Sequence, residues 1–580
     1  MAIVVQKFGG TSVADAVRVK RAAQKIIRAK AAGYQVVATV SARAGMTDEL
    51  IALAKAITPD PDPRELDMLV STGEQMSIAL MCMTLHALGH EAISFTGAQV
   101  GIMTDSAHTK ARIQTVETAA IRRELDKGKI VVVAGFQGID SDLNITTLGR
   151  GASDLTAVAL AAALQAELCE IYTDVEGVYT ADPRVVPGAV KLDAVSHDEI
   201  LELASVGAKV VQSRSVEVAK KFHVPLRVRS TFSDGPGTVV CARVEGFADV
   251  PVCGAALSLN ESRITIAGLP DTPGIAARVV GAIGERNINI DMIVQGFPVE
   301  RTADISFLVK DTDLSQALSV CHHVKEQVGA QAVLPEGEIA RVSAVGQGMI
   351  AHEGIAARMC TALGDGGINI KMITTSEINI SVVVDGARGE EALRAVHECF
   401  GLDRLPPGRP AADTPPELRL AELEAMESLH VQAVQLDRDQ AELKVLGLED
   451  KPGQAGLLLS ALAAARINLD IVLQNSCASG ISVTVKEADV ERAKAVVESM
   501  SPSVTRQPVE VGADIAKLSV SGVGLRSHAG AASRVFGVLA REGINIQMIG
   551  TSEVKISVIV AEADGERAAA ALRKELRLDN

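Results

Sequence analysis

The stretch AIVVQKFGGTSV, residues 2–13, decides how the first part of the chain is interpreted. A short apolar run leads to Lys7, two glycines follow, and residues 13–29 repeat apolar side chains at helical spacing; this pattern predicts a strand, a tight turn and a helix. Such a turn directs free backbone N–H groups and a helix dipole at one point, which favours a bound anion such as phosphate. Lys7 precedes the glycines, whereas the lysine of a P-loop follows them, so the stretch is not a P-loop.

The alternation of buried strands and helices continues to about residue 245. Strands such as VVATV (36–40) and KIVVVAGF (129–136) alternate with helical segments such as ASDLTAVALAAALQAE (152–167). Continuous apolar strands separated by helices are typical of an open, three-layer α/β/α sheet with helices on both faces. We therefore predict one α/β domain over residues 1–245.

The composition of the chain excludes several kinds of binding partner and structural site. A net charge of −15 and an aromatic content of 2% argue against nucleic acid, whose recognition needs a basic face and stacking rings. The eight cysteines form no CxxC pair, so neither a zinc cluster nor a disulfide framework is predicted. No apolar run reaches the roughly 20 residues of a membrane span, and Met1 leads straight into a strand pattern. We expect a cytoplasmic protein that binds small molecules, and neither nucleic acid nor membrane.

The remainder of the chain is a duplication. Residues 252–274 match 431–453 at a constant offset of 179, and residues 366–384 match 542–560 at an offset of 176. Each copy is itself double, because an Ile-Asn-Ile or Ile-Asn-Leu motif recurs after about eighty residues. Each module is predicted to run strand, glycine turn, helix and strand, as ferredoxin-like α+β folds begin. We predict four such modules in two tandem pairs, residues 252–400 and 431–576.

A proline-rich segment separates the two pairs. Residues 401–419 (GLDRLPPGRPAADTPPELR) contain five prolines, which disfavour a helix or a central strand. A short helix is expected over residues 417–429. Residues 401–430 are therefore predicted to be a linker with a short helix at its end.

Several polar residues of the first domain stand where strands give way to turns, the usual place of ligand sites in open α/β sheets. Each has an ordinary structural explanation. Thr11 or Ser12 could cap the first helix, Asp154 could cap the helix after GRGASD, and Lys209 could be a surface charge. Their combined order along the chain points to a function more strongly than any one of them.

Taken in order, KFGGTS (7–12), STGEQ (71–75), TTLGRGASDLTA (146–157), YTDVEGVYTADPR (172–184) and GAKVV (207–211) resemble the aspartate kinases of the amino-acid kinase family. The resemblance covers the whole first domain, and the four modules resemble the ACT domains of the same family. It implies transfer of the γ-phosphoryl group of ATP, with Mg²⁺, to the side-chain carboxylate of L-aspartate, the first step toward lysine, threonine and methionine. This carboxylate, with a pKa of about 3.9, is already ionised at neutral pH and needs no general base. The reaction instead needs cations and hydrogen-bond donors that bring two anions together.

The resemblance also implies roles for individual residues. Lys7, Asp154 and Lys209 would be catalytic: Lys7 bridges donor and acceptor, Lys209 contacts the nucleotide phosphates, and Asp154 orients the lysines. Arg150 would bind the α-carboxylate of aspartate as a planar fork, and Glu74 would accept hydrogen bonds from its ammonium group. No protein ligand is assigned to Mg²⁺, which retains waters and phosphate oxygens. The other expected ATP-binding residues are Phe8, Gly9, Gly10, Thr173, Asp174, Tyr179, Arg184 and Val210, and the other aspartate-binding residues are Ser41, Thr47 and Ser153.

Two positions depart from the family pattern. Ala152 replaces the second glycine of the common GRGGSD motif, and this matters if the position needs a positive φ or a close backbone approach. Residues 211–213 read VQS where LHP is common, so no nucleotide contact is assigned to them.

Lysine and threonine, either or both, are expected to bind the ACT modules and inhibit the enzyme, and a homodimer through these modules is expected. The acid, proline and glycine of DTPG (271–274) and DKPG (450–453) suit the start of a helix, where a carboxylate can bind. By the resemblance, one site would consist of Asp271, Gly274, Ile275, Ala276 and Gln295, with Asn369 and Ile370 from the paired module, and the other of Asp450, Gly453, Gln454, Ala455 and Gln474, with Asn545 and Ile546.

Two other functions stay open at the level of sequence. Another amino-acid kinase, acting on glutamate or N-acetylglutamate, is disfavoured by the combination of Glu74, Arg150 and the ACT modules. A catalytically silent amino-acid sensor is disfavoured because Lys7, Asp154 and Lys209 are all retained.

Overall fold

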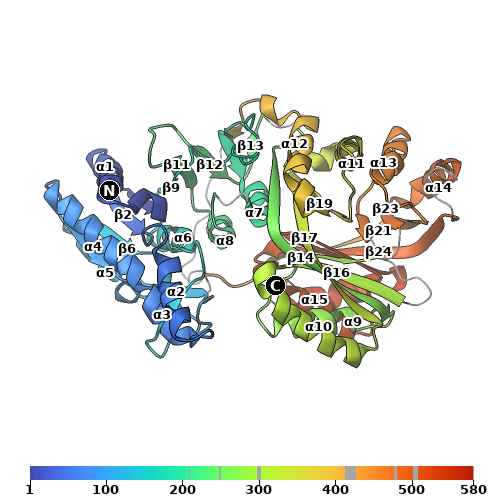
Figure 1. Ribbon diagram of the computed structural model, residues 1–580, viewed down its shortest axis with the longest axis horizontal. Helices are drawn as coiled ribbons and strands as arrows, with labels where there is room; N and C mark the ends of the chain where they lie inside the picture. The colour runs from blue at the N-terminus through green and yellow to red at the C-terminus, as the bar shows by residue number, and fades with distance from the viewer. Residues whose placement is uncertain are drawn as a thin grey trace.

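The computed structural model describes residues 1–207, 210–246, 250–296, 302–411, 426–475, 480–500, 507–528 and 530–578. It has two halves, named after the expected functions: the kinase half, residues 1 to about 245, coloured blue to teal in Figure 1, and the regulatory half, the remainder, coloured green to red. Lys209 and residues 417–425 of the expected short helix lie outside the described residues.

An eight-stranded sheet organises the kinase half. Its six neighbouring strands from β11 to β3 are parallel, whereas β12 runs antiparallel to β11 and pairs in parallel with β10 at the edge. Parallel strands end at the same edge, so the residues that follow β1, β2, β9 and β11 are brought together. In spatial order the strands are β10 (Ala194–Ser196), β12 (Thr238–Cys241), β11 (Leu226–Ser230), β9 (Leu168–Thr173), β1 (Ile3–Phe8), β2 (Gln35–Val40), β6 (Ile130–Ala134) and β3 (Ala92–Phe95).

Helices cover both faces of this sheet, as the three-layer prediction requires. Helices α1 and α4 pack on the face that carries Val4 and Val132, and α5 to α8 pack on the face that carries Val5 and Val131. Asp15, not Thr11 or Ser12, caps α1 by accepting hydrogen bonds from two backbone N–H groups. The helices are α1 (Ala16–Ala31), α2 (Met46–Ile57), α3 (Pro63–Val70), α4 (Thr72–Ala87), α5 (Ala119–Asp126), α6 (Ser153–Leu164), α7 (His197–Val206) and α8 (Ser213–Lys221).

A smaller sheet stands beside α3. Its strand order is β5 (Ile113–Val116), β4 (Ile102–Thr104), β7 (Gln137–Ile139) and β8 (Ile145–Thr147). Helices α3 and α4 together form the one stretch of the described residues, Pro63–Ala87, whose length and composition would allow it to cross a membrane. Half of its most apolar window is buried inside the protein, as in a core helix.

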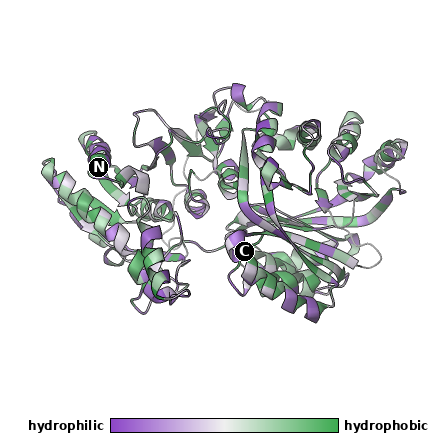
Figure 2. Cartoon of the chain, viewed as in Figure 1, coloured by the Kyte–Doolittle hydropathy of each residue, from purple (hydrophilic) through white to green (hydrophobic). Residues whose placement is uncertain are grey.

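The regulatory half is a closed ring of twelve strands. Helices with alternating hydrophobic and hydrophilic faces border the ring (Figure 2). The strands are β14 (Gly254–Pro270), β16 (Thr302–Lys310), β15 (Asp291–Gln295), β25 (Met548–Thr551), β26 (Lys555–Ala561), β24 (Glu510–Val523), β21 (His430–Leu446), β23 (Gly480–Val485), β22 (Val472–Asn475), β18 (Met372–Thr375), β19 (Asn379–Asp385) and β17 (Ala332–Val345). The helices are α9 (Ile275–Gly284), α10 (Leu314–Val328), α11 (Ile355–Asp365), α12 (Gly389–Cys399), α13 (Gln454–Ala464), α14 (Val490–Ser499), α15 (Ala531–Arg541) and α16 (Gly565–Glu575).

The long strands β14 and β17, and β21 and β24, pair within each copy, whereas the short edge strands and the helices that follow the glycine turns pair across the duplication. Strand β15 of the first module pairs with β25 of the fourth, and β18 of the second pairs with β22 of the third. Helix α9 packs against α15, and α11 packs against α13. The two tandem pairs of the sequence are therefore interleaved in space.

Helix α7 connects the two halves. The Oε1 atom of Glu199 accepts a hydrogen bond from the backbone N–H of Gln347 at 3.0 Å. Glu202 accepts one from Nδ2 of Asn379 at 2.7 Å and another from the backbone N–H of Glu553 at 3.1 Å. One helix of the kinase half thus contacts the second and the fourth modules.

Two parts of the predicted linker pack against the rest of the protein. Arg409–Pro410 form strand β20, which pairs with β13 (Val244–Glu245). Met426 is fully buried in the core of the kinase half, and the described end of the expected short helix, residues 426–429, is not helical. The carboxylate of Glu427 pairs with Arg214 at 2.7 Å. The linker therefore docks on the kinase half before the second copy begins.

Candidate active site and effector sites

Predicted phosphate-site residues meet at the carboxyl edge of the large sheet. Strand β1 ends at Phe8 and β9 at Thr173. The backbone N–H of Gly9 donates to the carbonyl of Tyr172 at 3.3 Å, and that of Ser41 donates to the carbonyl of Phe8 at 3.0 Å. These hydrogen bonds connect the carboxyl ends of β1, β2 and β9 directly, at the edge where ligand sites of open α/β sheets are found.

Lys7 and Asp154 form a buried ion pair at this edge. Their Nζ and Oδ1 atoms are 2.7 Å apart, and the two residues are 9% and 5% exposed. Asp154 stands in the first turn of α6, and its other oxygen accepts a hydrogen bond from the backbone N–H of Gln212 at 3.1 Å. The pair fixes a lysine ammonium beside a helix N-terminus, an arrangement that favours a bound anion.

Of the two glycines after Lys7, Gly10 is required by space, whereas a Cβ atom on Gly9 would press on the Lys7 side chain. A Cβ atom on Gly10 would lie 2.7 Å from the carbonyl oxygen of Ala42, and one on Gly9 would lie 3.2 Å from the Lys7 ammonium nitrogen. Any larger residue would therefore displace the backbone or the lysine. The close turn places backbone N–H groups beside the Lys7 ammonium, an arrangement that favours a bound phosphate.

Glu74 lies in the first turn of α4, near the end of β2. Its Oε1 atom accepts a hydrogen bond from the backbone N–H of Ala42 at 2.9 Å, whereas its Oε2 atom is buried without a hydrogen-bond partner. Burial raises the pKa of Glu74 to about 7. A half-satisfied buried carboxyl group of this kind fits a site for a cationic ligand group.

Arg150 lies on the surface and forms an ion pair with Asp48 of α2. Thr47 precedes Asp48 and is half-buried, and Ser153 is buried at the start of α6. The structure thus brings Arg150 to the helix that carries Thr47. The partner Asp48 was not predicted, because an acid in the first turn of a helix usually has only a local role.

Both departures from the family pattern fit the structure. Ala152 is fully buried with φ −74°, so a methyl group is accommodated there, whereas the flanking Gly149 and Gly151 have φ of +91° and +78°. Gln212, the middle residue of VQS, contacts Asp154 through its backbone, a contact that any side chain would allow.

The residues expected around the nucleotide are more dispersed. Thr173 Oγ1 donates to Asp174 at 3.1 Å. Burial raises the pKa of Tyr179, whose backbone pairs with that of Lys191. Arg184 is exposed and binds Asp182, and Val210 is half-buried. The contact between the hydroxyls of Ser12 and Thr231, which lie 2.6 Å apart, was not predicted. Thr231 directly follows β11, and this position at the end of a parallel strand could have indicated that it belongs to the site.

The predicted effector residues gather in two pockets, but their partners are exchanged. Asn545 donates to Asp271 at 2.7 Å, and Asn369 donates to Asp450 at 2.8 Å. The expected pairing of Asn369 and Ile370 with Asp271 is therefore wrong, because the modules pair across the duplication. Asp271, Gly274, Ile275, Ala276, Gln295, Asn545 and Ile546 line one pocket, and Asn369, Ile370, Asp450, Gly453, Gln454, Ala455 and Gln474 line the other.

Two glutamines, the buried Gln295 and the half-buried Gln474, give these pockets unused acceptors. Gln295 donates through Nε2 to the carbonyl of Ile546 at 2.9 Å, and Gln474 donates to the carbonyl of Ile370 at 3.4 Å. The Oε1 atoms of both side chains are buried without a hydrogen-bond partner. A ligand with an ammonium group would supply the missing donor.

Family models match most of the chain. The amino acid kinase family model matches residues 2–230. The ACT domain model matches four times, at residues 264–324, 342–400, 444–500 and 518–576.

One solved structure matches the whole chain, and the other relatives named below match about seven-tenths of it. An aspartate kinase of Stutzerimonas stutzeri is 50% identical over 404 residues, which cover 70% of this chain and 98% of the relative. The crystal structure of aspartate kinase from Synechocystis is 39% identical, covers 100% of this chain and 98% of that one, and has a TM-score of 0.53. E. coli aspartokinase III in complex with aspartate and ADP is 28% identical over 68% of this chain and 99% of that one, with a TM-score of 0.60. The same enzyme in complex with lysine and aspartate is 26% identical over 69% and 99%, with a TM-score of 0.51.

Proposed function

The chain belongs to the aspartate kinase family, with an amino-acid kinase domain followed by four ACT domains, and from this we propose how it transfers the γ-phosphoryl group of ATP to the side-chain carboxylate of L-aspartate, giving 4-phospho-L-aspartate. The buried pair of Lys7 and Asp154 is the observation that carries the proposal. It holds a cation where the glycine turn and the N-terminus of α6 both favour phosphate.

Lys7 would bind the transferring phosphoryl group and draw the two anions together. Asp154 would hold its ammonium group in place, and Gly9 and Gly10 would allow backbone N–H groups to approach the phosphates. We also assign Lys209 to the nucleotide phosphates. Phe8, Thr173, Asp174, Tyr179, Arg184 and Val210 are assigned to the remainder of the nucleotide.

Glu74 and Arg150 would bind opposite ends of L-aspartate. The unpartnered Oε2 atom of Glu74 suits an ammonium group, and the exposed guanidinium of Arg150 suits the α-carboxylate. Arg150 would then exchange its Asp48 partner for the substrate. Ser41, Thr47 and Ser153 would complete the aspartate site.

Mg²⁺ would be held mainly by the phosphate oxygens of ATP and by water, since this ion gives up its waters reluctantly. Among the described residues, no cluster of three or more His, Cys, Asp or Glu side chains has metal-ligand geometry.

Lysine and threonine would act as feedback inhibitors at the two pockets between ACT domains. E. coli aspartokinase III has been crystallised with lysine, which supports lysine as an effector of this chain. We retain a homodimer through the ACT domains and a cytoplasmic location as proposals. Because the ring uses the strand edges of all four modules within one chain, a second copy would contact outer surfaces of the regulatory half.

The experiment that tests the activity traps the acyl phosphate. The protein, freed of amino acids, is incubated with ATP, Mg²⁺, hydroxylamine and either aspartate, glutamate or N-acetylglutamate. We expect a hydroxamate from aspartate only. A product from another acceptor would favour a different amino-acid kinase, and no product at all would favour an amino-acid sensor.

A further inference from the structure

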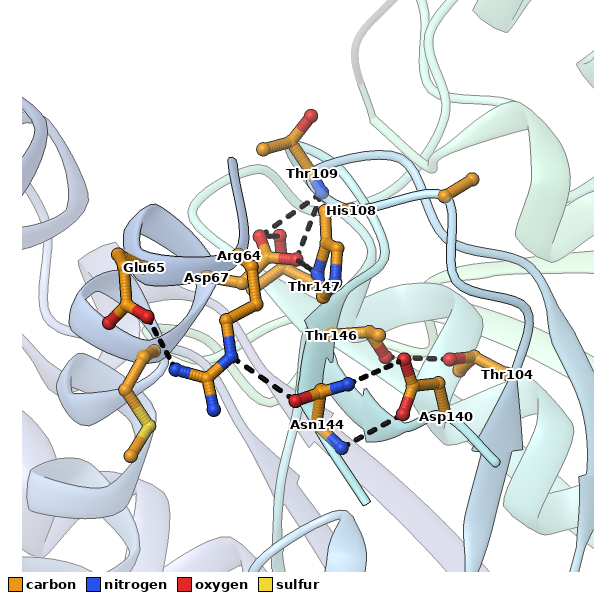
Figure 3. Close-up of polar contacts among 12 residues, drawn as sticks. Arg64, Glu65, Asp67, Thr104, His108, Thr109, Asp140, Asn144, Thr146 and Thr147 are labelled. Atoms are coloured by element: carbon orange, nitrogen blue, oxygen red, sulfur yellow. Dashed lines mark hydrogen bonds and ion pairs between the residues drawn. The ribbon is translucent and has the colours of Figure 1, made fainter. Parts of the chain in front are cut away.

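Figure 3 shows the fully buried carboxylate of Asp67 in α3 with its contacts to His108, Thr109 and Thr147. Its Oδ1 atom accepts a hydrogen bond from the Thr147 hydroxyl at 2.5 Å, and its two oxygens lie 3.1 and 3.0 Å from the backbone nitrogen of Thr109. Nδ1 of His108 lies 2.9 Å from Oδ2. Removing a carboxylate from water is costly, so this group stays buried only while these donors surround it.

The donors come from two segments that the chain separates widely from α3. Thr109 and His108 belong to the loop between β4 and β5, and Thr147 ends β8. The loop and β8 are also bonded to each other, since the backbone N–H of Ala111 donates to the carbonyl of Thr147 at 2.9 Å. Asp67 therefore fixes three segments relative to one another.

Both charged residues assigned to aspartate are attached to these segments. Arg150 stands three residues after Thr147. Gly149, between them, lies close to the β4–β5 loop, because a Cβ atom added to it would lie 3.6 Å from the carbonyl oxygen of Thr109. On the other side, α3 ends at Val70 and α4, which carries Glu74 in its first turn, starts at Thr72. The Asp67 carboxylate thus joins α3, which leads into the helix that carries Glu74, to β8, which leads to Arg150. These are the two residues that would bind opposite ends of the substrate.

We propose that Asp67 is a positioning residue that sets the separation between Glu74 and Arg150 and thereby the affinity for L-aspartate. The inference rests on the proposed function of these two residues. Asp67 contacts neither the Lys7–Asp154 pair nor the glycine turn through any interaction in the described part of the chain. Its effect should accordingly fall on aspartate and not on ATP.

The test is Asp67→Asn in the full-length protein, with separate KM values for aspartate and ATP. The amide has the size of the carboxylate but turns an NH2 group toward donors, so the network loosens. We expect the KM for aspartate to rise at least about tenfold, the scale at which small misplacements of binding groups act. The KM for ATP should stay within about twofold of the parent value, a split that a general loss of folded protein does not produce.

Asp140→Asn is the matched control, because Asp140 is also a buried carboxylate and lies in the small sheet beside α3, between β7 and β8 (Figure 3). It accepts hydrogen bonds from the backbone N–H groups of Asp142 and Asn144 at 3.0 and 2.8 Å within its own hairpin, and it also interacts with Ser106 of the β4–β5 loop, but it has no contact with Asp67 or Thr147 among these interactions. We expect a lower melting temperature and an unchanged KM for aspartate. Equal rises in the KM for aspartate in the two variants, or an equal rise for ATP in Asp67→Asn, would overturn the inference.

Arg150→Ala separates this inference from the proposed function. If Arg150→Ala leaves the KM for aspartate unchanged, the site assignment is wrong. If Arg150→Ala raises it and Asp67→Asn does not, only the role of Asp67 is wrong. Should Asp67→Asn fail to fold, Thr147→Val removes one of the same hydrogen bonds, and it must raise the KM for aspartate alone.

Discussion

Asn545 donates a hydrogen bond to Asp271 across 274 residues of sequence, at 2.7 Å. The matching contact, from Asn369 to Asp450, spans 81 residues. Each proposed effector pocket is therefore built from both copies of the duplication, so a single pocket can be altered by a substitution in either copy.

Asn545→Ala should impair the same effector response as Asp271→Ala, and Asn369→Ala the same one as Asp450→Ala. Inhibition curves with lysine and with threonine, at fixed ATP and aspartate, would show the pairing. The double variant of Asn545 and Asp271 should be little worse than either single one, because the two residues share one contact. If Asn369 instead groups with Asp271, the interleaved arrangement does not govern effector binding.

Lys7→Met should lower kcat by at least about 10²- to 10³-fold, the cost of removing a group that stabilises transition-state charge. Hydroxamate formation measures it. The control is thermal unfolding, which should show a folded protein, since methionine keeps most of the side-chain volume. A variant that folds and retains near-parental kcat would remove Lys7 from the catalytic role.

Glu74 should give aspartate binding a pH dependence. Burial raises its pKa to about 7, so the carboxylate that would bind an ammonium group forms only as the pH rises through that value. We expect the KM for aspartate to fall as the pH rises from 6 to 8, because this range is centred on the Glu74 pKa of about 7. In Glu74→Gln this dependence should vanish and the KM stay high throughout.

The same residue should affect stability in the opposite direction. The folded-state pKa of Glu74, about 7, exceeds the ordinary value of about 4.3. The contribution of protonated Glu74 is therefore complete below about pH 4.3 and is lost as the pH rises through 7. Denaturant unfolding of the parent and of Glu74→Gln should show the glutamine variant gaining relative stability as the pH rises; a constant difference would contradict the buried environment.

Glu202→Gln should weaken the coupling between the halves. Glu202 is fully buried and contacts Asn379 of the second module and Glu553 of the fourth, and burial raises its pKa. We expect basal kcat to change little, whereas the maximal inhibition by an effector falls by about 5-fold or more, the lower end of ordinary allosteric coupling. Effector binding, measured by calorimetry, should persist; loss of binding would place Glu202 in the effector site.

Gly456→Ala should destabilise the regulatory half. A Cβ atom there would lie 2.9 Å from the backbone of Thr361, where α13 packs on α11, and overpacking of this kind costs about 1–3 kcal/mol. Gly537→Ala is the control, because its Cβ would meet only the end of the Arg541 side chain at 3.8 Å. Denaturant unfolding should show a loss for the first variant and none for the second.

The sequence predicts the three-layer sheet and the four modules, because strand and helix periodicity and internal repeats are local signals. The resemblance to ACT domains supplies the pocket residues as one set, without the correct division between the two pockets. The sequence does not predict the exchange of partners at Asp271 and Asp450, since both arrangements satisfy the same hydrogen bonds. Nor does it reveal the burial of Met426 and Glu427, whose docking depends on Arg214 from a distant helix. The roles of Asp48 and Gln212 were missed for the same reason: each acts through a contact that only the fold creates.

The closure of twelve strands within one polypeptide has a consequence for how inhibition depends on enzyme abundance. Two halves of a pocket that sit on separate chains come apart on dilution, whereas tethered halves meet at a high and fixed effective concentration. Sensitivity to the end products should therefore be the same in a sparse cell extract and in a concentrated one.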